Sequence, residues 1–287
     1  MEKLIVKSYA KINLSLDVLG RRSDGYHLVS MVMQSVNLYD MLVFEKSDNL
    51  SINCNNRDIP LDENNLIMKA ALILKDKYGG SGAEIFLNKK IPIAAGLGGG
   101  SSNAAATLYA LNKLWKLNLN KKDLKEIALL LGADVPFFIE GGTKLSEGIG
   151  ERLKDLKAPK MSVLIVNPAV NVSTAEVYKR YDDLNISNNN YTKKMIKAIN
   201  SGNIYNIAEK LGNDLERVTI NMYPIIEKMK TDMAELGAIG TLMSGSGSTV
   251  FGIFDEDKLL QNAEKEFNKR GFFAYIANTI DKGIEFI

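Results

Sequence analysis

Polar and hydrophobic residues alternate near the start of the chain, between Ser8 and Gly20. The polar positions are Lys11, Asn13, Ser15 and Asp17, and the hydrophobic ones are Ile12, Leu14, Leu16 and Val18. A period of two predicts a β-strand with one buried face, because successive side chains of a strand point to opposite sides. Lys11 and Asn13 would be neighbours on the polar face, where the ordinary interpretation of a lysine is a solvated surface residue.

A turn should follow this strand, because residues Arg21 to Tyr26 contain an Asp-Gly pair, which is typical of tight turns. The apolar residues from Val29 to Phe44 predict one or two further strands, and the turn would make a hairpin with the first of them. The polar stretch from Asp48 to Asn65 predicts a loop with room for a short strand. Another alternating strand is expected from Ala83 to Ile91.

Apolar residues at helical spacing predict three helices in the first half of the chain. The first would be capped by Asn64 or Asn65 and would end at about Tyr78. The second would run roughly over Ser101 to Leu117. The third would extend from about Lys122 to Gly132, where a glycine suits a left-handed C-cap.

The second half should begin with a buried strand from Met161 to Val166. Ser173 and Glu176 fit a capping box, so a helix should begin there and carry Tyr178 in its first turns. The asparagine-rich stretch from Asp182 to Lys194 has the composition of a mobile connection. Two helices should follow it, the second opening at Pro224 and closing at Gly237.

The composition is that of a globular protein of 287 residues, with 46% hydrophobic and 24% charged residues. This length suits two domains, and we place their boundary after Lys157, giving residues 1–157 and 158–287. With 36 basic and 34 acidic residues, the net charge gives no reason to expect a nucleic-acid partner. The single cysteine, Cys54, fits a reducing cytoplasm. The N-terminus lacks the long apolar core of a signal peptide, and no stretch approaches the length of a membrane span. We therefore expect a cytoplasmic protein without a membrane partner.

The densest run of small residues lies between Pro92 and Asn103, after a predicted strand and before a predicted helix. Glycines let several backbone N–H groups converge on an anion, and Ser101 and Ser102 fall where the helix should begin. A helix N-terminus adds unpaired donors and the positive end of the helix dipole, so phosphate is the expected ligand. The run lacks the Gly-Lys-Ser/Thr ending of a P-loop and the third glycine of the dinucleotide fingerprint.

Three further features are candidates for chemistry. Asp134 lies between a helix stop and an apolar run, where a buried carboxylate is costly unless it is paired or used, although a loop or capping role is the alternative. His27 is the only histidine, so a zinc site built from protein ligands is not expected. Residues Ser244 to Thr249 form a second small-residue loop, which could be a tight turn or could close with the first loop over a ligand.

Three segments resemble, in order and spacing, the motifs of the GHMP small-molecule kinases. They are Tyr9 to Leu14, Gly96 to Ser102, and Ser244 to Thr249. Four further segments are similar to the branch of that family that acts on 4-diphosphocytidyl-2-C-methyl-D-erythritol, and they are Ala10 to Leu14, Arg22 to His27, Gly132 to Phe138, and Asn213 to Glu216. The resemblance covers essentially the whole chain.

The resemblance implies a two-domain α+β protein with an S5-like N-terminal domain, a ferredoxin-like C-terminal domain and an active site in the cleft between them. It implies transfer of the γ-phosphoryl group of ATP to the 2-hydroxyl of that cytidine-bearing substrate, in the non-mevalonate route to isoprenoids. Lys11 and Asp134 would be catalytic, and Asn13, Tyr26, His27, Thr174 and Tyr178 would bind the substrate, with Tyr26 and His27 on the cytosine. The ATP phosphates would be bound by Pro92, Ile93, Ala94, Ala95, Gly96, Leu97, Gly98, Gly99, Gly100, Ser101 and Ser102.

Several alternatives stay open from the sequence. Asp134 would either accept the hydroxyl proton or only orient the hydroxyl. Mg²⁺ should accompany ATP, with Ser102 as a candidate ligand and no established protein site. The protein could instead be a kinase of the same fold for mevalonate, homoserine or a sugar. A nucleic-acid-binding module is the alternative from another class, and the near-zero net charge argues against it.

Overall fold

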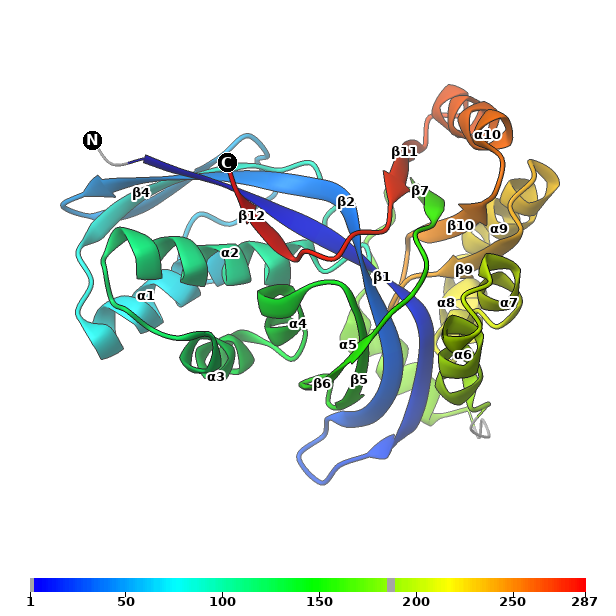
Figure 1. Cartoon of the computed structure of the whole chain (residues 1–287), viewed down its shortest axis with the longest axis horizontal. Helices are drawn as coiled ribbons and strands as arrows, with labels where there is room; N and C mark the ends of the chain where they lie inside the picture. The colour runs from blue at the N-terminus through cyan, green and yellow to red at the C-terminus, as the bar shows by residue number, and fades with distance from the viewer. Residues whose placement is uncertain (1–2, 185–188) are drawn as a thin grey trace.

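A long antiparallel hairpin connects the two halves of the molecule (Figure 1). It consists of β1 (Lys3–Arg21) and β2 (His27–Ser47), joined at the predicted turn. Their pairing shifts register between Tyr9 and Ala10, between Asn13 and Ser15, and between Val18 and Gly20. Such irregularities bend a strand pair, and the hairpin here curves from one sheet towards the other. The computed structural model describes residues 3–184 and 189–287.

Within the described residues, the hairpin belongs to an eight-stranded sheet whose central order is β12-β1-β2-β4-β3. The added strands are β3 (Leu50–Cys54), β4 (Gly82–Asn88) and β12 (Ile284–Phe286). β5 (Thr143–Gly148) pairs with β2 and with β6 (Arg152–Leu156), and β8 (Gly212–Asn213) pairs with β1. Two strands from the second half of the chain, β8 and β12, therefore complete a sheet built mainly by the first half.

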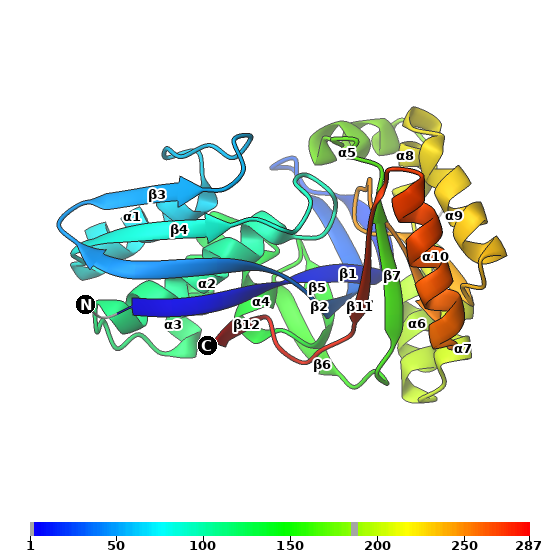
Figure 2. The same cartoon turned by 90° about the horizontal axis from the view of Figure 1, so that it is seen from above.

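Four helices lie on one side of this sheet (Figure 2). They are α1 (Leu66–Tyr78), α2 (Gly99–Leu114), α3 (Lys121–Leu131) and α4 (Val135–Glu140). α2 lies against β1 and β2, and its buried face includes Ala104, Leu108 and Leu111. The predicted cap of the first helix is confirmed, because Asn65 accepts a hydrogen bond from the N–H of Ile67.

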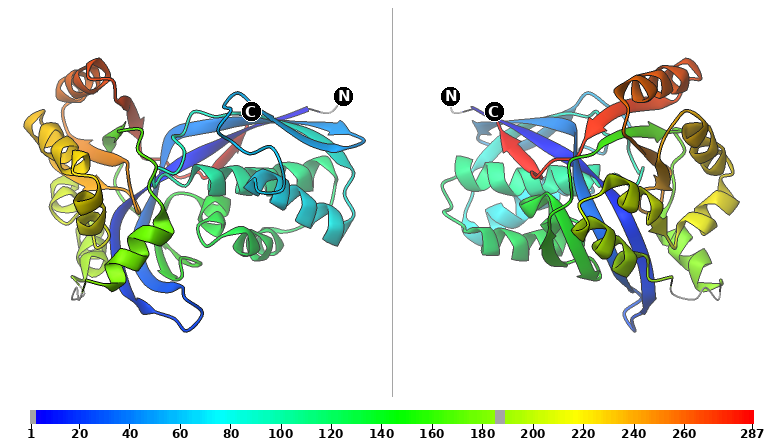
Figure 3. Two further views of the ribbon diagram at one scale, coloured as in Figure 1. Left: turned by 180° about the vertical axis from the view of Figure 1, so that it is seen from behind. Right: turned by 45° about the vertical axis from the view of Figure 1, so that its right-hand side comes forward.

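The second sheet is antiparallel, in the order β11-β7-β10-β9. Its strands are β7 (Ser162–Asn167), β9 (Gly240–Met243), β10 (Val250–Phe254) and β11 (Phe273–Asn278). α9 (Ile225–Glu235) and α10 (Asp257–Lys269) cover one face (Figure 3). The remaining helices are α5 (Thr174–Asp182), α6 (Tyr191–Asn200), α7 (Ile204–Glu209) and α8 (Glu216–Met222).

The other face of the smaller sheet packs on the hairpin. Ile12 and Leu14 of β1 share a hydrophobic core with Ile165 and Phe251 of that sheet. The prediction that β1 has a single buried face is wrong, because the alternate residues Asn13, Ser15 and Asp17 are buried as well. Lys11 is only 4% exposed, so its interpretation as a solvated surface residue is wrong as well.

Three local predictions also need correction. α2 begins at Gly99 rather than at Ser101, since Gly98 takes the left-handed conformation before it and the serines lie inside the first turn. Gly132 has φ 161°, which is extended and not a left-handed cap. The expected mobile connection from Asp182 to Lys194 already contains the start of α6 at Tyr191, whereas residues 185–188 lie outside the described part.

The described segment from Tyr191 to Glu235 contains four helices, α6 to α9, instead of the predicted two. The predicted domain boundary after Lys157 stays a prediction. β8 and β12 lie beyond it in sequence and pair with β1 of the larger sheet. No helix within the described residues combines the length and the apolar character that crossing a membrane requires.

Candidate active site

A cavity of about 1020 Å³ brings together most of the residues singled out from the sequence. The hairpin, the glycine loop, the start of α2 and helix α5 all contribute to its wall. The expected site residues that line it are Lys11, Asn13, Tyr26, His27, Pro92, Ile93, Ala94, Ala95, Gly96, Gly98, Gly99, Gly100, Ser101, Asp134, Thr174 and Tyr178. Two expected ATP-binding residues, Leu97 and Ser102, do not line the cavity that the described residues form, and both are buried behind its wall.

The glycine loop requires glycine for two separate reasons. Gly96 and Gly98 have φ values of 75° and 69°, which most L-residues avoid. A Cβ on Gly96 would lie 2.0 Å from the carbonyl oxygen of Ser244, and one on Gly98 would lie 2.5 Å from the ring of Phe138. The loop thus brings the N-terminus of α2 to the cavity wall, where its first-turn N–H groups can bind an anion.

The second small-residue loop touches the first. The Ser244 hydroxyl donates to the carbonyl oxygen of Gly96 at 2.9 Å, and the Thr249 N–H donates to that of Ala95 at 3.4 Å. The same Ser244 oxygen accepts from the N–H of Asn13 at 3.3 Å. Gly245 and Ser246 reach the cavity wall, so both loops enclose one space.

Lys11 and Asp134 face each other in this cavity. The Lys11 Nζ lies 3.8 Å from Asp134 Oδ2 and donates a hydrogen bond of 2.6 Å to Asn13 Oδ1. Burial lowers the pKa of Lys11, and the negative charge of Asp134 acts in the opposite direction. Asp134 occupies the N-cap position of α4, but its side chain makes no capping hydrogen bond to the described residues, so the capping interpretation is wrong. Its carboxylate is one-third exposed, with 33% side-chain accessibility.

Aromatic groups gather at another part of the wall. The rings of His27 and Tyr178 are stacked, with centroids 4.6 Å apart and an interplanar angle of 23°. His27 Nε2 shares a hydrogen bond of 2.6 Å with Asp182 Oδ1, while Tyr26 is 59% exposed. Burial raises the pKa of Tyr178 far above its ordinary value of 10.0, with a smaller contribution from the charge of Asp134, so its hydroxyl stays protonated. Thr174 Oγ1 lies 2.8 Å from Ser246 Oγ, and this contact joins the start of α5 to the second loop.

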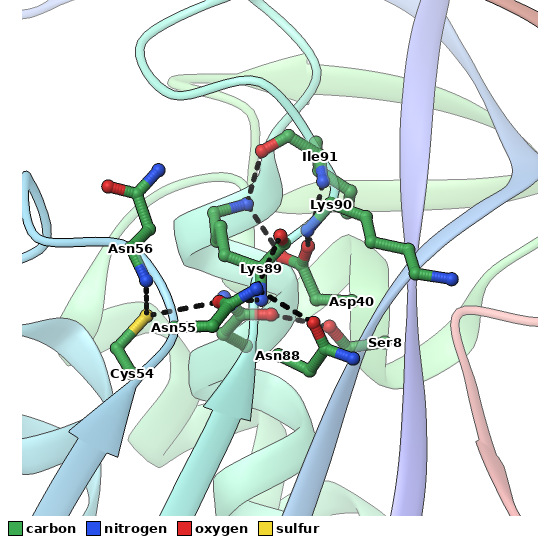
Figure 4. Close-up of polar contacts among 10 residues, drawn as sticks. Ser8, Asp40, Cys54, Asn55, Asn56, Asn88, Lys89, Lys90 and Ile91 are labelled. Carbon is green, nitrogen blue, oxygen red and sulfur yellow. Dashed lines mark hydrogen bonds and ion pairs between the residues drawn. The ribbon is translucent and has the colours of Figure 1, made fainter.

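A buried ion pair between Asp40 and Lys89, which lies just before the glycine loop in the chain, was not expected from the sequence (Figure 4). Lys89 Nζ lies 2.6 Å from Asp40 Oδ2 and also donates to the carbonyl oxygen of Ile91. The other Asp40 oxygen accepts from the N–H groups of Lys90 and Ile91 at 2.7 and 2.8 Å. Lys89 reaches the cavity wall, and burial lowers its pKa against the opposing charge of Asp40. A sequence feature that could have indicated this pair is Asp40, a charged residue within the apolar run of β2.

Two further contributions to the site were missed. Asp182 was assigned only to the start of a connection, although it lines the cavity and holds His27. The segment before α1, expected as a loop, also supplies part of the wall, through Ile59, Pro60, Asn64 and Asn65, and α1 adds Leu66.

The donor set for a metal ion is small. Within the described residues, no group of three or more His, Cys, Asp or Glu side chains could hold a metal ion. Ser102 Oγ, in the first turn of α2, is buried and has no hydrogen-bond partner among the described residues. Mg²⁺ prefers oxygen ligands, but this hydroxyl lies behind the cavity wall, so the described residues do not present it to an ion in the cavity.

Comparison with known families agrees with this arrangement. The model described as GHMP kinases N terminal domain matches residues 65–142, and that described as GHMP kinases C terminal matches residues 195–271. The first match contains the glycine loop and Asp134. The chain therefore belongs to the GHMP kinase family, with its two-domain α+β fold.

Similar proteins define the branch more narrowly. The 4-diphosphocytidyl-2-C-methyl-D-erythritol kinase of Thermoanaerobacter pseudethanolicus is 52% identical, with 99% of each chain covered. The kinase of the same name from another Thermoanaerobacter species is 50% identical at the same coverage. The crystal structure of a 4-(cytidine 5'-diphospho)-2C-methyl-D-erythritol kinase superposes with a TM-score of 0.80 at 31% identity, covering 96% of this chain and 98% of that one. Within the GHMP kinases, this chain is a member of the branch that these relatives define.

Proposed function

We propose that the protein transfers the γ-phosphoryl group of ATP to the 2-hydroxyl of 4-diphosphocytidyl-2-C-methyl-D-erythritol, giving the 2-phosphate and ADP. The reaction belongs to the non-mevalonate pathway of isoprenoid precursor biosynthesis. One observation carries the proposal: a single cavity contains an anion-binding glycine loop, a lysine–carboxylate pair and a group of aromatic side chains. The relatives that share this chain over its whole length carry the name of this activity.

The glycine loop and the start of α2 would bind the phosphates of ATP. Gly98, Gly99 and Gly100 line the cavity, and without a Cβ they let phosphate oxygens approach the backbone N–H groups closely. Phosphoryl transfer depends mainly on positioning and on stabilising the charge of the transferred group. The loop would therefore do most of its work by holding the γ-phosphate in line with the acceptor.

Asp134 would act on the acceptor hydroxyl. A tertiary alcohol is a weak nucleophile until its proton leaves, and a carboxylate within hydrogen-bonding reach can accept that proton. Lys11 is held by Asn13 next to Asp134, so its positive charge would stabilise both the carboxylate and the negative charge of the transferred phosphoryl group. If the proton leaves late, Asp134 would orient the hydroxyl instead.

The aromatic part of the cavity would bind the cytosine. A pyrimidine offers two faces for stacking and an edge for hydrogen bonds. Tyr26 has an exposed ring at the cavity wall, and His27 is held in orientation by Asp182 and by the ring of Tyr178. Thr174, at the start of α5, would contribute a hydroxyl to the same pocket.

Mg²⁺ would accompany ATP through the phosphates, because the candidate protein ligand, the hydroxyl of Ser102, is buried behind the cavity wall. When bound, the ion supplies charge neutralisation on the phosphates. We also place the reaction in the cytoplasm, because the proposed substrates are small charged molecules and the one cysteine is free.

The test is ADP release by the purified protein with Mg-ATP and, in separate reactions, the cytidine-bearing alcohol, mevalonate, homoserine and galactose. Phosphorus NMR should detect a new phosphomonoester only with the cytidine-bearing alcohol. Turnover with one of the other alcohols would keep the ATP site and overturn the roles of Tyr26 and His27. RNA binding that weakens steeply with salt, without ATP turnover, would overturn the kinase assignment.

A further inference from the structure

The segment Asn213 to Glu216 resembles the kinase branch in sequence, yet the mechanism above gives it no role. Asn213 and Asp214 are buried, with 6% and 3% exposure, and they stand outside the cavity wall as the described residues define it. Asn213 ends β8, which pairs with β1 through Leu16, and the Asp214 N–H donates to the carbonyl oxygen of Leu16 at 2.9 Å. The segment is therefore anchored to the strand that carries Lys11.

The side chain of Asn213 is directed to the second small-residue loop. Its Nδ2 donates to the carbonyl oxygens of Met243 at 2.9 Å and of Gly245 at 2.7 Å. Its Oδ1 accepts from the N–H of Leu215 at 3.0 Å, which fixes the orientation of the amide. One side chain thus spans the end of β9 and the turn that follows it.

Gly245 links this contact to the reacting part of the cavity. A Cβ placed on Gly245 would lie 3.5 Å from Lys11 Nζ and 3.4 Å from the Cα of Gly96. The turn held by Asn213 therefore stands beside both the catalytic lysine candidate and the glycine loop. A shift of this turn would displace the phosphate side of the cavity.

The side chain of Asp214 is directed away from the second loop, towards β1 and α5. Asp214 Oδ2 accepts from the N–H of Val18 at 2.9 Å, and Oδ1 accepts from Asn189 Nδ2 at 2.8 Å. Its carboxylate is also hydrogen-bonded to the side chain of Tyr181 in α5. The same helix carries Tyr178 and Asp182, which hold His27, and it lies against α8 (Figure 2). Asp214 therefore connects the far end of β1 to the helix that forms the aromatic wall.

We propose that Asn213 and Asp214 are positioning residues for the two substrates separately. Asn213 sets the place of the second loop, and with it the ATP side of the cavity. Asp214 sets the place of α5 relative to the hairpin, and with it the acceptor side. The inference rests on the proposed function, because it assumes that the phosphate loop and the aromatic wall bind different substrates.

The test compares Asn213→Ala and Asp214→Ala by steady-state kinetics with both substrates. Small displacements of binding groups can cost up to about 10²-fold, so each variant should lose about tenfold to 10²-fold in kcat/KM for one substrate through a higher KM for it, with kcat nearly unchanged. For Asn213→Ala that substrate should be ATP, and for Asp214→Ala the cytidine-bearing alcohol. The KM for the other substrate should stay within about twofold.

Asn112→Ala is the matched control. Asn112 also bridges two backbone groups, since its side chain donates to the carbonyl oxygen of Leu119 and accepts from its N–H, both at 3.0 Å. It lies in α2 near the helix end and is absent from the cavity lining formed by the described residues. Its variant should lose stability without changing the ratio of the two KM values. Asp214→Asn, which keeps one acceptor oxygen, should recover part of the acceptor binding.

Equal changes in both KM values for the two variants, as for a general loss of folding, would overturn the inference. If an alanine variant does not fold, Asn213→Ser and Asp214→Asn give the same comparison with smaller disruption. If wild-type protein does not use the cytidine-bearing alcohol, the proposed function fails independently. In that case, ATP titration and kinetics with whichever alcohol is turned over still show whether Asn213→Ala affects ATP binding and Asp214→Ala affects acceptor binding.

Discussion

The Nζ of Lys11 is 3.8 Å from Asp134 Oδ2, while its short hydrogen bond, at 2.6 Å, goes to Asn13. The lysine is therefore held mainly by the amide and stands beside the carboxylate without a close hydrogen bond to it. Asp134 retains acceptor capacity on the cavity side, where its side chain is partly exposed. This geometry supports proton acceptance by Asp134 with a fixed positive charge nearby.

Replacing Asp134 by Asn should lower kcat by about 10² or more and leave the affinity for ATP nearly unchanged. The amide keeps the size of the side chain but cannot accept the hydroxyl proton in the same way. Single-turnover kinetics and ATP titration measure the two effects separately. Full activity of this variant would remove Asp134 from the mechanism.

The activity should decline at alkaline pH because Lys11 loses its proton. Burial lowers the pKa of Lys11 below its ordinary value of 10.5. Between that lowered pKa and 10.5, Lys11 is protonated in the unfolded chain but not in the folded protein. The contribution of Lys11 to stability therefore rises with pH over this range. Its positive charge in the active site is lost over the same range. Lys11→Arg stays charged, so its smaller kcat should not fall over the same pH range. An alkaline decline that persists in Lys11→Arg would assign it to another group.

Tyr26→Ala should weaken acceptor binding by about 1 to 3 kcal/mol if the ring stacks on the base. Tyr205→Ala is a suitable control, because Tyr205 is similarly exposed, at 55% against 59% for Tyr26, and is absent from the cavity wall built by the described residues. The acceptor KM should rise for the first variant only. An unchanged acceptor KM for Tyr26→Ala would reject the stacking role.

Gly96→Ala should abolish most ATP binding, whereas Gly79→Ala should not affect it. The two glycines have nearly the same φ, 75° and 76°, so an alanine suffers similar backbone strain of about 1 kcal/mol at either position. Only at Gly96 would the new Cβ meet the second loop, 2.0 Å from the Ser244 oxygen. A Cβ on Gly79 would have no heavy atom of the described residues within 4 Å, apart from its chain neighbours. Thermal unfolding and ATP titration of both variants test this difference, and equal ATP affinity would contradict it.

Asp40→Asn should reduce the free energy of unfolding by about 3 to 5 kcal/mol, because it leaves the buried ammonium of Lys89 without its partner. The double variant Asp40→Asn with Lys89→Met removes both charges and should recover much of that loss. Urea unfolding measures both effects. For comparison, Glu45→Gln breaks the exposed pair with Lys3 and should cost less than about 1 kcal/mol. A loss for Asp40→Asn no larger than that for Glu45→Gln would show that the buried pair does not stabilise the fold more than an exposed one.

Local sequence signals were sufficient for much of the fold and for part of the site. The alternation around Lys11, the asparagine before α1 and the small residues from Pro92 onward each depend on neighbours in sequence, and they gave a strand, a cap and a loop. The start of α2 was missed by two residues because a left-handed Gly98, rather than a serine side chain, ends the loop.

Features that depend on distant partners could not be obtained in this way. His27 and Asp182 are 155 positions apart, and Lys89 and Asp40 are 49 apart, so no local pattern pairs them. Lys11 has the pattern of a surface residue but is buried, because Gly98, Asp134 and Gly245, all distant in sequence, lie against its side chain. The catalytic and binding roles of the site residues came from the resemblance to the kinase family, because hydrophobic periodicity gives secondary structure and not function.

The return of β12 to the larger sheet has a consequence for the order in which the protein is made. β12 pairs with Val6, Lys7 and Ser8 of β1. The segment before β12 also packs closely on the first half of the chain, since a Cβ on Gly141 would lie 2.0 Å from the backbone nitrogen of Gly283. A nascent chain that has emerged only to Lys157 would have an unpaired β1 edge, which is a site for pairing with other chains. The first sheet to begin on the ribosome is thus completed last, when Ile284 to Phe286 become available.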